Sequence, residues 1–287
     1  MKYSLCTISF RHQLISFRHQ LISFTDIVQF AYENGFEGIE LWGTHAQNLY
    51  MQERETTERE IDYLKDKNLE VTMISDYLDI SLSADFQKTM EKCEQLVTLA
   101  NWFNTNKIRT FAGQKGSEDF SEQERKEYVK RIRMICDLFA QYNMYILLET
   151  HPNTLTDTLP STLKLLEEVN HPYLKINLDF LHIWESGADP VDSFQRLKPW
   201  IQHYHFKNIS SAEYLHVFEP NNVYAAAGSR IGMVPLFEGI VNYDEIIREV
   251  SNTDHFASLE WFGHNAKDIL KEEMRALTNR KLEVVTL

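Results

Sequence analysis

Apolar runs of strand length recur along this chain at fairly even intervals, and an amphipathic stretch follows each of them. The eight runs cover residues 3–9, 36–42, 69–75, 107–113, 144–150, 173–179, 201–207 and 256–262. Near-continuous apolar strands that alternate with helices are typical of a parallel sheet covered on both faces. Eight such units predict an α/β fold of the closed (β/α)8 TIM-barrel type. A doubly wound open sheet is the second choice, because no GxGxxG motif follows the first run.

Helix start signals lie between the runs. An N-cap residue followed three positions later by an acid, or followed directly by proline, marks the first turn of a helix. The predicted starts are Thr57 with Glu60, Ser121 with Glu124, Asn242 with Glu245, and Asp189 with Pro190.

The organisation of the chain favours one domain over residues 1–287. The chain has 287 residues, of which 43% are hydrophobic, and this is enough for one large core. Residues 208–241 are expected to form a long irregular loop over the mouth of the barrel. The segment SFRHQLI occurs at 9–15 and again at 16–22. Two copies are too few for a coiled coil, so we interpret them as a tandem duplication that lengthens the loop after the first strand.

Charge and composition exclude several classes of protein. The net charge of −13, with no basic stripe, argues against a nucleic-acid partner. No apolar stretch approaches the ~18 residues that a membrane span needs. Three scattered cysteines without a CxxC pair, and a first segment unlike a secretory signal, predict a cytoplasmic protein. The sequence leaves the choice between a monomer and a homodimer open.

Four metal-ligand types lie at the ends of the last four predicted strands: Glu149, Asp179, His205 and Glu260. In a barrel of this kind, side chains at the carboxyl ends of the strands converge on one site. Three carboxylates so close together repel one another unless a cation lies between them. Mostly oxygen ligands with one nitrogen predict Mn²⁺ or Mg²⁺, with Co²⁺ or Zn²⁺ as substitutes.

Other polar residues follow the same strand ends. Each of them is expected either to contact a substrate or to play an ordinary structural role, and the residue types alone do not decide between the two. They are Glu40, Tyr77, Arg109, His151, His182 and Lys207.

Several motifs resemble a known family. The segments ILLETHPN, INLDFLH, HYHFKN and SLEWFG, in this order, resemble the xylose-isomerase-like TIM barrels, which include sugar isomerases, epimerases and endonuclease IV. KYSLCTISFRHQLISF, GFEGIELWGTHAQN, KIRTFAGQKGS and HYHFKNISSA further resemble the 3-dehydroshikimate dehydratases of petrobactin siderophore biosynthesis. The second SFRHQLI departs from that pattern.

The resemblance implies a lyase, more narrowly a hydro-lyase, that converts 3-dehydroshikimate into 3,4-dihydroxybenzoate (protocatechuate), the catechol unit of a siderophore. It implies a divalent metal that stabilises an enolate and is held by Glu149, Asp179, His205 and Glu260. It places His151, His182, Lys207 and Tyr77 among the catalytic residues. It implies that Arg109 and Tyr224 bind the substrate, and we add Glu40 to this group.

Particular roles follow as hypotheses. His151 is our choice for the base and His182 the alternative, because a neutral imidazole suits proton abstraction near pH ~7. Arg109 can pair with the ring carboxylate through two donors. Lys207 is expected to stabilise the enolate oxygen or to help the hydroxyl leave, and Tyr224 to close over the ring.

Three other functions compete with this hypothesis. A sugar or sugar-phosphate isomerase or epimerase starts from a similar enolate, but a neutral sugar has no carboxylate for Arg109. An endonuclease needs a basic cleft, which the acidic composition disfavours. A metal-binding scaffold or sensor would have a closed coordination sphere, whereas catalytic sites keep an open position.

Overall fold

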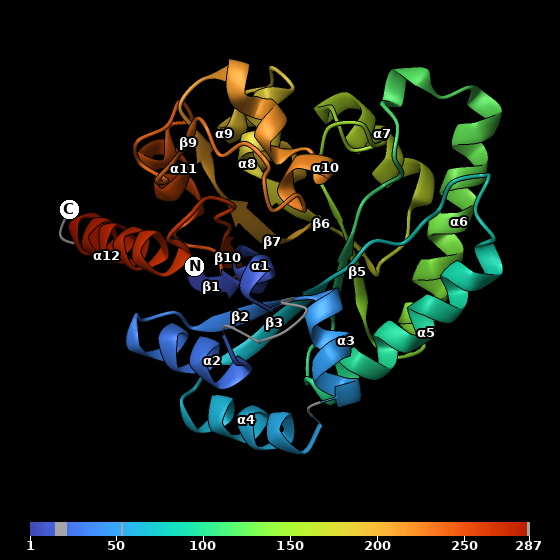
Figure 1. The fold of residues 1–287 in the computed structure, drawn as a ribbon. Helices are drawn as coiled ribbons and strands as arrows, with labels where there is room; N and C mark the ends of the chain where they lie inside the picture. The colour runs from blue at the N-terminus through green and yellow to red at the C-terminus, as the bar shows by residue number, and fades with distance from the viewer. Residues whose placement is uncertain (15–21, 53, 286–287) are drawn as a thin grey trace. The chain divides into compact units, whose positions relative to one another are not determined.

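The sheet of this protein is a closed ring of eight parallel strands. The computed structural model describes residues 1–14, 22–52 and 54–285 (Figure 1). The order of the strands is β1-β10-β7-β6-β5-β4-β3-β2, which confirms the predicted (β/α)8 barrel. Apart from Ile22, the second copy of SFRHQLI lies outside the described residues.

Each of the eight apolar runs coincides with one strand of the barrel; seven strands lie wholly within their runs, and β1 begins one residue earlier, at Lys2. The strands are β1 (Lys2–Cys6), β2 (Gly38–Trp42), β3 (Glu70–Ser75), β4 (Lys107–Thr110), β5 (Tyr145–Glu149), β6 (Leu174–Asp179), β7 (Ile201–Phe206) and β10 (Phe256–Leu259). Most of the predicted runs extend past the carboxyl ends of their strands, because the chain there no longer forms hydrogen bonds with the neighbouring strands. After β10, for example, the Trp261 amide donates to Ser9 Oγ at 3.0 Å instead of to a neighbouring strand.

The helices fill the intervals between the strands. The α-helices are α1 (Arg11–Leu14), α2 (Phe24–Glu33), α3 (Gly43–Gln52), α4 (Arg54–Asp66), α5 (Phe86–Trp102), α6 (Glu122–Ala140), α7 (Leu159–Val169), α8 (Phe180–Glu185), α9 (Pro190–Leu197), α10 (Pro220–Val223), α11 (Tyr243–Val250) and α12 (Ala266–Val285). Three 3-10 helices are η1 (Thr7–Phe10), η2 (Ser117–Asp119) and η3 (Ala212–Phe218).

The chain forms two compact units, and the first consists of residues 1–70 and 205–287. In this unit β1 pairs in parallel with β10 and with β2, so that Leu5 lies opposite both Leu259 and Ile39. All three side chains are fully buried. Helices α2 and α4 lie side by side outside these strands (Figure 1).

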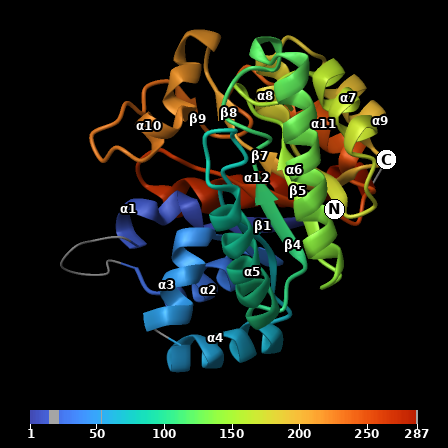
Figure 2. The ribbon, with the colours of Figure 1, turned by 90° about the vertical axis from the view of Figure 1, so that its right-hand side faces the viewer.

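The second unit consists of residues 71–204. Here β5 pairs with β4 on one side and with β6 on the other, and Leu148 lies opposite Thr110 and Ile176. Helices α5 and α6 run alongside each other (Figure 2), and α7 contacts α6 in turn. Their apolar residues face inward, as the amphipathic pattern predicts.

Three of the four predicted helix starts are confirmed. Ser121 forms a complete capping box with Glu124, and Asp189 and Asn242 each accept the amide three positions ahead. The prediction for Thr57 was wrong, because α4 already begins at Arg54. Thr57 is 1% exposed and packs within that helix, so its hydroxyl does not start it.

Residues 208–241 contain more structure than predicted. Strands β8 (Asn208–Ile209) and β9 (Met233–Val234) pair antiparallel, and η3 and α10 lie between them. Asn208 anchors the base of this segment: its Nδ2 donates to the carbonyls of Leu236 and Val241, and its Oδ1 accepts from the Val241 amide. We call residues 210–241 the mouth segment.

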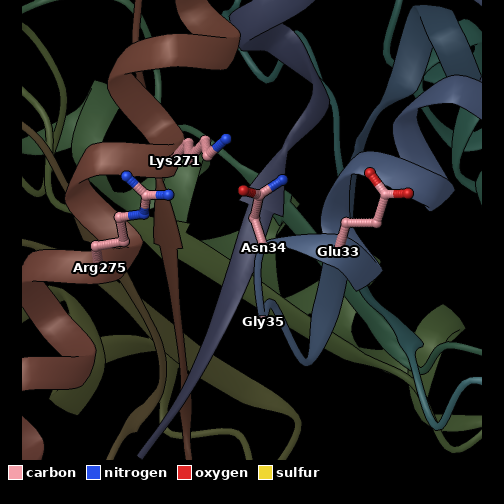
Figure 3. A pocket seen from close by; sticks show the side chains of 5 residues that line it. All are labelled: Glu33, Asn34, Gly35, Lys271 and Arg275. Carbon is pink, nitrogen blue, oxygen red and sulfur yellow. The ribbon is translucent and has the colours of Figure 1, made fainter.

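A cavity of about 550 Å³ lies in the first unit. Figure 3 shows Lys271 and Arg275 of α12 on one side of it, and Glu33, Asn34 and Gly35 from the end of α2 on the other. Gly35 lies three residues before the start of β2, so this cavity lies at the amino end of a strand, where residues of a TIM barrel serve stability. Separately, none of the helices among the described residues is long and apolar enough to cross a membrane.

Candidate functional site

Glu40 and His205 form a fully buried pair in the first unit. Glu40 is the middle residue of β2 and His205 lies near the end of β7, and both are 0% exposed. The Nε2 atom of His205 lies 3.1 and 3.0 Å from the two carboxylate oxygens of Glu40. Since a carboxylate only accepts, Nε2 carries the proton, and the lone pair of a neutral ring is on Nδ1. Nδ1 lies 3.4 Å from Glu260 Oε2.

Lys207 and Glu260 form a second buried pair in the same unit. The Nζ atom of Lys207 donates to Glu260 Oε2 at 2.7 Å, and the two residues are 5% and 4% exposed. The hydroxyl of Tyr243 contacts both the amide and the carbonyl of Lys207, which fixes the backbone there. The thiol of Cys6 lies 3.9 Å from Glu260 Oε1. Cys6, Glu40 and Glu260 thus make a buried group whose ligand atoms lie within 4.8 Å of one another and could hold a metal ion.

In the second unit, Arg109 and Glu149 lie at the ends of the paired strands β4 and β5. Arg109 Nε is 3.0 Å from Glu149 Oε2, and both side chains are 3% exposed. The guanidinium also lies over the rings of Tyr77 and Phe111, at 5.3 and 5.2 Å. Removing one partner of such a buried ion pair strongly destabilises the folded protein, because the other charge is left buried without a counter-charge.

Asp179 is the last residue of β6, and His182 lies in α8, three residues further on. Asp179 caps α8, since its Oδ1 accepts the amides of Leu181 and His182. Its Oδ2 lies 4.0 Å from His182 Nε2. On the other side of the ring, His182 Nδ1 lies 2.7 Å from Glu185 Oε2. The imidazole of His182 is therefore held between two carboxylates.

His151 lies against His182. The centroids of the two rings are 4.5 Å apart, and Phe111 covers His151 at 4.2 Å. His151 Nδ1 lies 2.8 Å from the carbonyl oxygen of Pro152. Because a carbonyl only accepts, Nδ1 is the protonated atom, and Nε2 is the basic atom of the neutral ring.

Tyr224 lies in the mouth segment, directly after α10. Its side chain is 39% exposed, and its ring stacks on Trp42 with 5.9 Å between the centroids and 26° between the planes. Trp42 ends β2, two residues after Glu40. Within the first unit, the structure therefore places Tyr224 over the end of a barrel strand.

Each unit thus brings several predicted residues together. Glu40, His205, Lys207 and Glu260 form one buried group, and Tyr77, Arg109, Glu149, His151, Asp179 and His182 lie at the ends of β3 to β6. The sequence analysis missed Glu185, although its position three residues after His182 on a helix is a signal for a side-chain pair. It also missed Phe111 and Cys6, for which the sequence offers only their places next to strand ends.

Comparison with known proteins identifies the family. The family model described as "Xylose isomerase-like TIM barrel" matches residues 28–280. The chain belongs to that family. Over 286 residues it is 86% identical to a 3-dehydroshikimate dehydratase of Bacillus anthracis, and the match covers 100% of both chains.

Solved structures agree with this assignment. One is the crystal structure of the probable 3-DHS dehydratase AsbF involved in petrobactin synthesis from Bacillus anthracis. It has a TM-score of 0.94 and 86% identity, and the match covers 98% of this chain and 100% of that one. A zinc-bound IOLI protein, at 13% identity, has a TM-score of 0.76 over 100% of this chain and 98% of its own. An L-ribulose 3-epimerase, also at 13% identity, has a TM-score of 0.75 over 99% of this chain and 96% of its own. The last two matches show the fold alone.

Proposed function

We propose that this protein dehydrates 3-dehydroshikimate to 3,4-dihydroxybenzoate, and so acts as a hydro-lyase that supplies the catechol unit of a siderophore. The observation that carries this proposal is the 86% identity to a 3-dehydroshikimate dehydratase over the full length of both chains. The reaction removes the proton at C4 and the hydroxyl at C5 of the substrate as water. Loss of a proton from C6 to the C3 oxygen then completes the aromatic ring.

The proposed cofactor is one divalent metal ion, Mn²⁺ or Mg²⁺, held by Glu149, Asp179, His205 and Glu260. These residues fit such an ion, because three carboxylates and an imidazole, all at most 4% exposed, are a hard donor set with little access to water. Glu149, Asp179 and His205 lie on β5, β6 and β7, and Glu260 directly follows β10. These four strands are consecutive in the barrel. When bound, the ion would polarise the ketone of the substrate. Co²⁺ and Zn²⁺ are the expected substitutes.

Glu40 has a role in this proposal that differs from the substrate contact we expected. Because its carboxylate faces His205 Nε2, it fixes the tautomer and the orientation of the ring. Carboxylate partners of this kind are common behind metal-ligating histidines. We therefore assign Glu40 to the positioning of His205.

The proposed base is His151. Its Nδ1 proton is held by the Pro152 carbonyl, so that Nε2 can take the proton from C4 of the substrate. His182 is the alternative, and there the Glu185 carboxylate would stabilise the imidazolium that forms.

The remaining residues bind the substrate and assist the leaving group. Arg109, held in place by Tyr77 and Phe111, is proposed to pair with the ring carboxylate. Lys207 is 2.7 Å from Glu260 and can donate a proton to the departing hydroxyl or stabilise the C3 oxygen. Tyr224 is proposed to cover the ring from the mouth segment.

The same proposal places the enzyme in the cytoplasm as one barrel domain that does not bind nucleic acid. Its cysteines Cys6, Cys93 and Cys136 are buried and form no disulfide with one another, which suits a reducing compartment.

A substrate panel tests the proposed function. The purified protein is given 3-dehydroshikimate or neutral ketoses and aldoses, and the products are separated by chromatography. We expect 3,4-dihydroxybenzoate from 3-dehydroshikimate and no sugar interconversion, whereas epimerised sugar without aromatic product would favour the sugar isomerase or epimerase.

A further inference from the structure

Arg11 is a buried arginine that the proposed reaction does not use. It is 3% exposed and begins α1, directly after η1. Its guanidinium donates to three backbone carbonyls: Nε to Val223 at 2.6 Å, Nη2 to Phe262 at 3.0 Å and Nη1 to Ile8 at 3.4 Å. It also lies 5.2 Å from the centre of the Phe262 ring. Among the described residues, no carboxylate lies within ion-pair distance of it.

These three carbonyls belong to segments that are far apart in the sequence. Ile8 follows β1, Phe262 lies two residues after Glu260, and Val223 ends α10 immediately before Tyr224. A single side chain thus ties the mouth segment to two strand ends of the first unit. The connection to Tyr224 is one peptide bond long.

A second arginine secures the same turn. Arg230 donates to the carbonyls of Ala225 at 2.9 Å and Asn222 at 3.1 Å, and its Nη2 lies 3.3 Å from His12 Nε2. Arg11 binds the turn that carries Tyr224 directly, and His12, its neighbour in α1, contacts the Arg230 side chain that binds the same turn. Two arginines, Arg11 and Arg230, therefore hold the turn through its backbone carbonyls.

An arginine suits this position better than any other residue. Its planar fork offers five donors in fixed directions, whereas the lysine ammonium is a compact, strongly hydrated charge. Burial and the nearby Arg230 lower the pKa of Arg11 to about 10, so the group stays charged at neutral pH. Burial of a charge is costly, and here three carbonyl dipoles offset that cost. No smaller side chain at this position could reach all three.

We propose that Arg11 is a positioning residue that fixes Tyr224 over the end of β2, where the tyrosine stacks on Trp42. The effect on catalysis rests on the proposed function, in which Tyr224 covers the substrate ring, whereas the effect on the Tyr224–Trp42 stack does not. The proposal also gives a role to the repeated motif. The first SFRHQLI supplies Arg11 and His12, while Arg18 and His19 of the second copy lie outside the described residues.

A double-mutant cycle tests the catalytic part. Arg11→Lys keeps the charge but loses the fork, and we expect KM for 3-dehydroshikimate to rise about tenfold while kcat stays within about twofold. In a Tyr224→Ala background the same change should alter KM by less than about twofold, because the effects of substitutions at two coupled residues do not add. Arg275→Lys, at an exposed position on α12, is the matched control and should leave KM unchanged.

Trp42 fluorescence tests the structural part without using activity. For each protein, a matching variant that also carries Trp42→Phe is made. Subtracting the spectrum of that variant leaves the emission of Trp42. Trp42 is 6% exposed under Tyr224, so Arg11→Lys should shift its emission to longer wavelength, and Arg275→Lys should not. If Arg11→Lys fails to fold, Arg230→Lys, at a partly exposed position that holds the same turn, should give a smaller shift in the same direction.

Two results would overturn the proposal. One is a KM increase from Arg11→Lys that persists undiminished in the Tyr224→Ala background. The other is a Trp42 emission that neither Arg11→Lys nor Arg230→Lys alters. If the wild-type protein does not convert 3-dehydroshikimate at all, the proposed function fails, and the fluorescence experiment still decides whether Arg11 holds Tyr224.

Discussion

Glu273 makes the stability of this protein depend on pH in a way that one substitution should remove. This residue of α12 is 4% exposed, and its Oε1 accepts the Leu236 amide at 3.0 Å, near the base of the mouth segment. Burial raises the pKa of Glu273 from 4.5 to about 8. The folded protein therefore keeps this carboxyl protonated at pH values where the unfolded chain has released the proton.

The sign of the effect follows from proton linkage. Below pH ~4.5 both states are protonated, and Glu273 adds no pH dependence. As the pH rises from there, only the unfolded state loses the proton, so the free energy of unfolding falls until the folded group also ionises at about 8. The slope reaches about 1.4 kcal/mol per pH unit in the middle of that window and is smaller near both pKa values, which gives on the order of 3 kcal/mol between about pH 5 and about pH 8.

Glu273→Gln removes the titrating group and keeps an oxygen for the Leu236 amide. Urea unfolding at about pH 5 and about pH 8 should show that wild type loses on the order of 3 kcal/mol more than the variant. Glu272→Gln, the adjacent exposed residue on the same helix, is the control and should retain the wild-type pH dependence. If wild type and Glu273→Gln lost stability in parallel, the reasoning would be refuted.

Three further substitutions test the site and the fold. Glu149→Gln should lower metal binding and activity together by more than about a hundredfold, measured by metal analysis and product absorbance; full activity without metal would contradict the site. Arg109→Lys should lower kcat/KM at least about tenfold, because the fork that pairs with carboxylates is lost, and an unchanged value would remove Arg109 from the substrate site. Gly239→Ala should lower the free energy of unfolding by about 1–3 kcal/mol, because its added methyl would collide with Asn208, whereas Gly116→Ala meets only ordinary contacts of 3.4 Å or more.

The sequence predicted those parts of the fold that depend on local pattern. Seven of the eight barrel strands lie within the apolar runs, and β1 begins one residue before its run, at Lys2. The runs mark the strands because strands covered on both faces are apolar along most of their length. The start of α6 at Ser121 could also be predicted from the sequence, since both members of its capping box lie within four residues. Thr57 has the same local pattern but packs inside α4, and only tertiary contacts distinguish the two cases.

Long-range contacts set the features that the sequence did not reveal. Arg11 is buried because its partners Val223 and Phe262, which are 212 and 251 residues away, fold over it. The pair of β8 and β9 spans two residues on each side, which is too short for a periodic signal. The metal-ligand residue types could be proposed from the strand ends, but the pairing of Glu40 with His205 joins residues 165 positions apart.

The decisive experiment is an assay of chelator-stripped protein with 3-dehydroshikimate, with and without added Mn²⁺ or Mg²⁺. The product is followed by its ultraviolet absorbance. We expect 3,4-dihydroxybenzoate to form only when metal is restored, and we expect His151→Asn to bind metal without forming product. Product formation at the full rate in the stripped protein, with no metal bound, would contradict it.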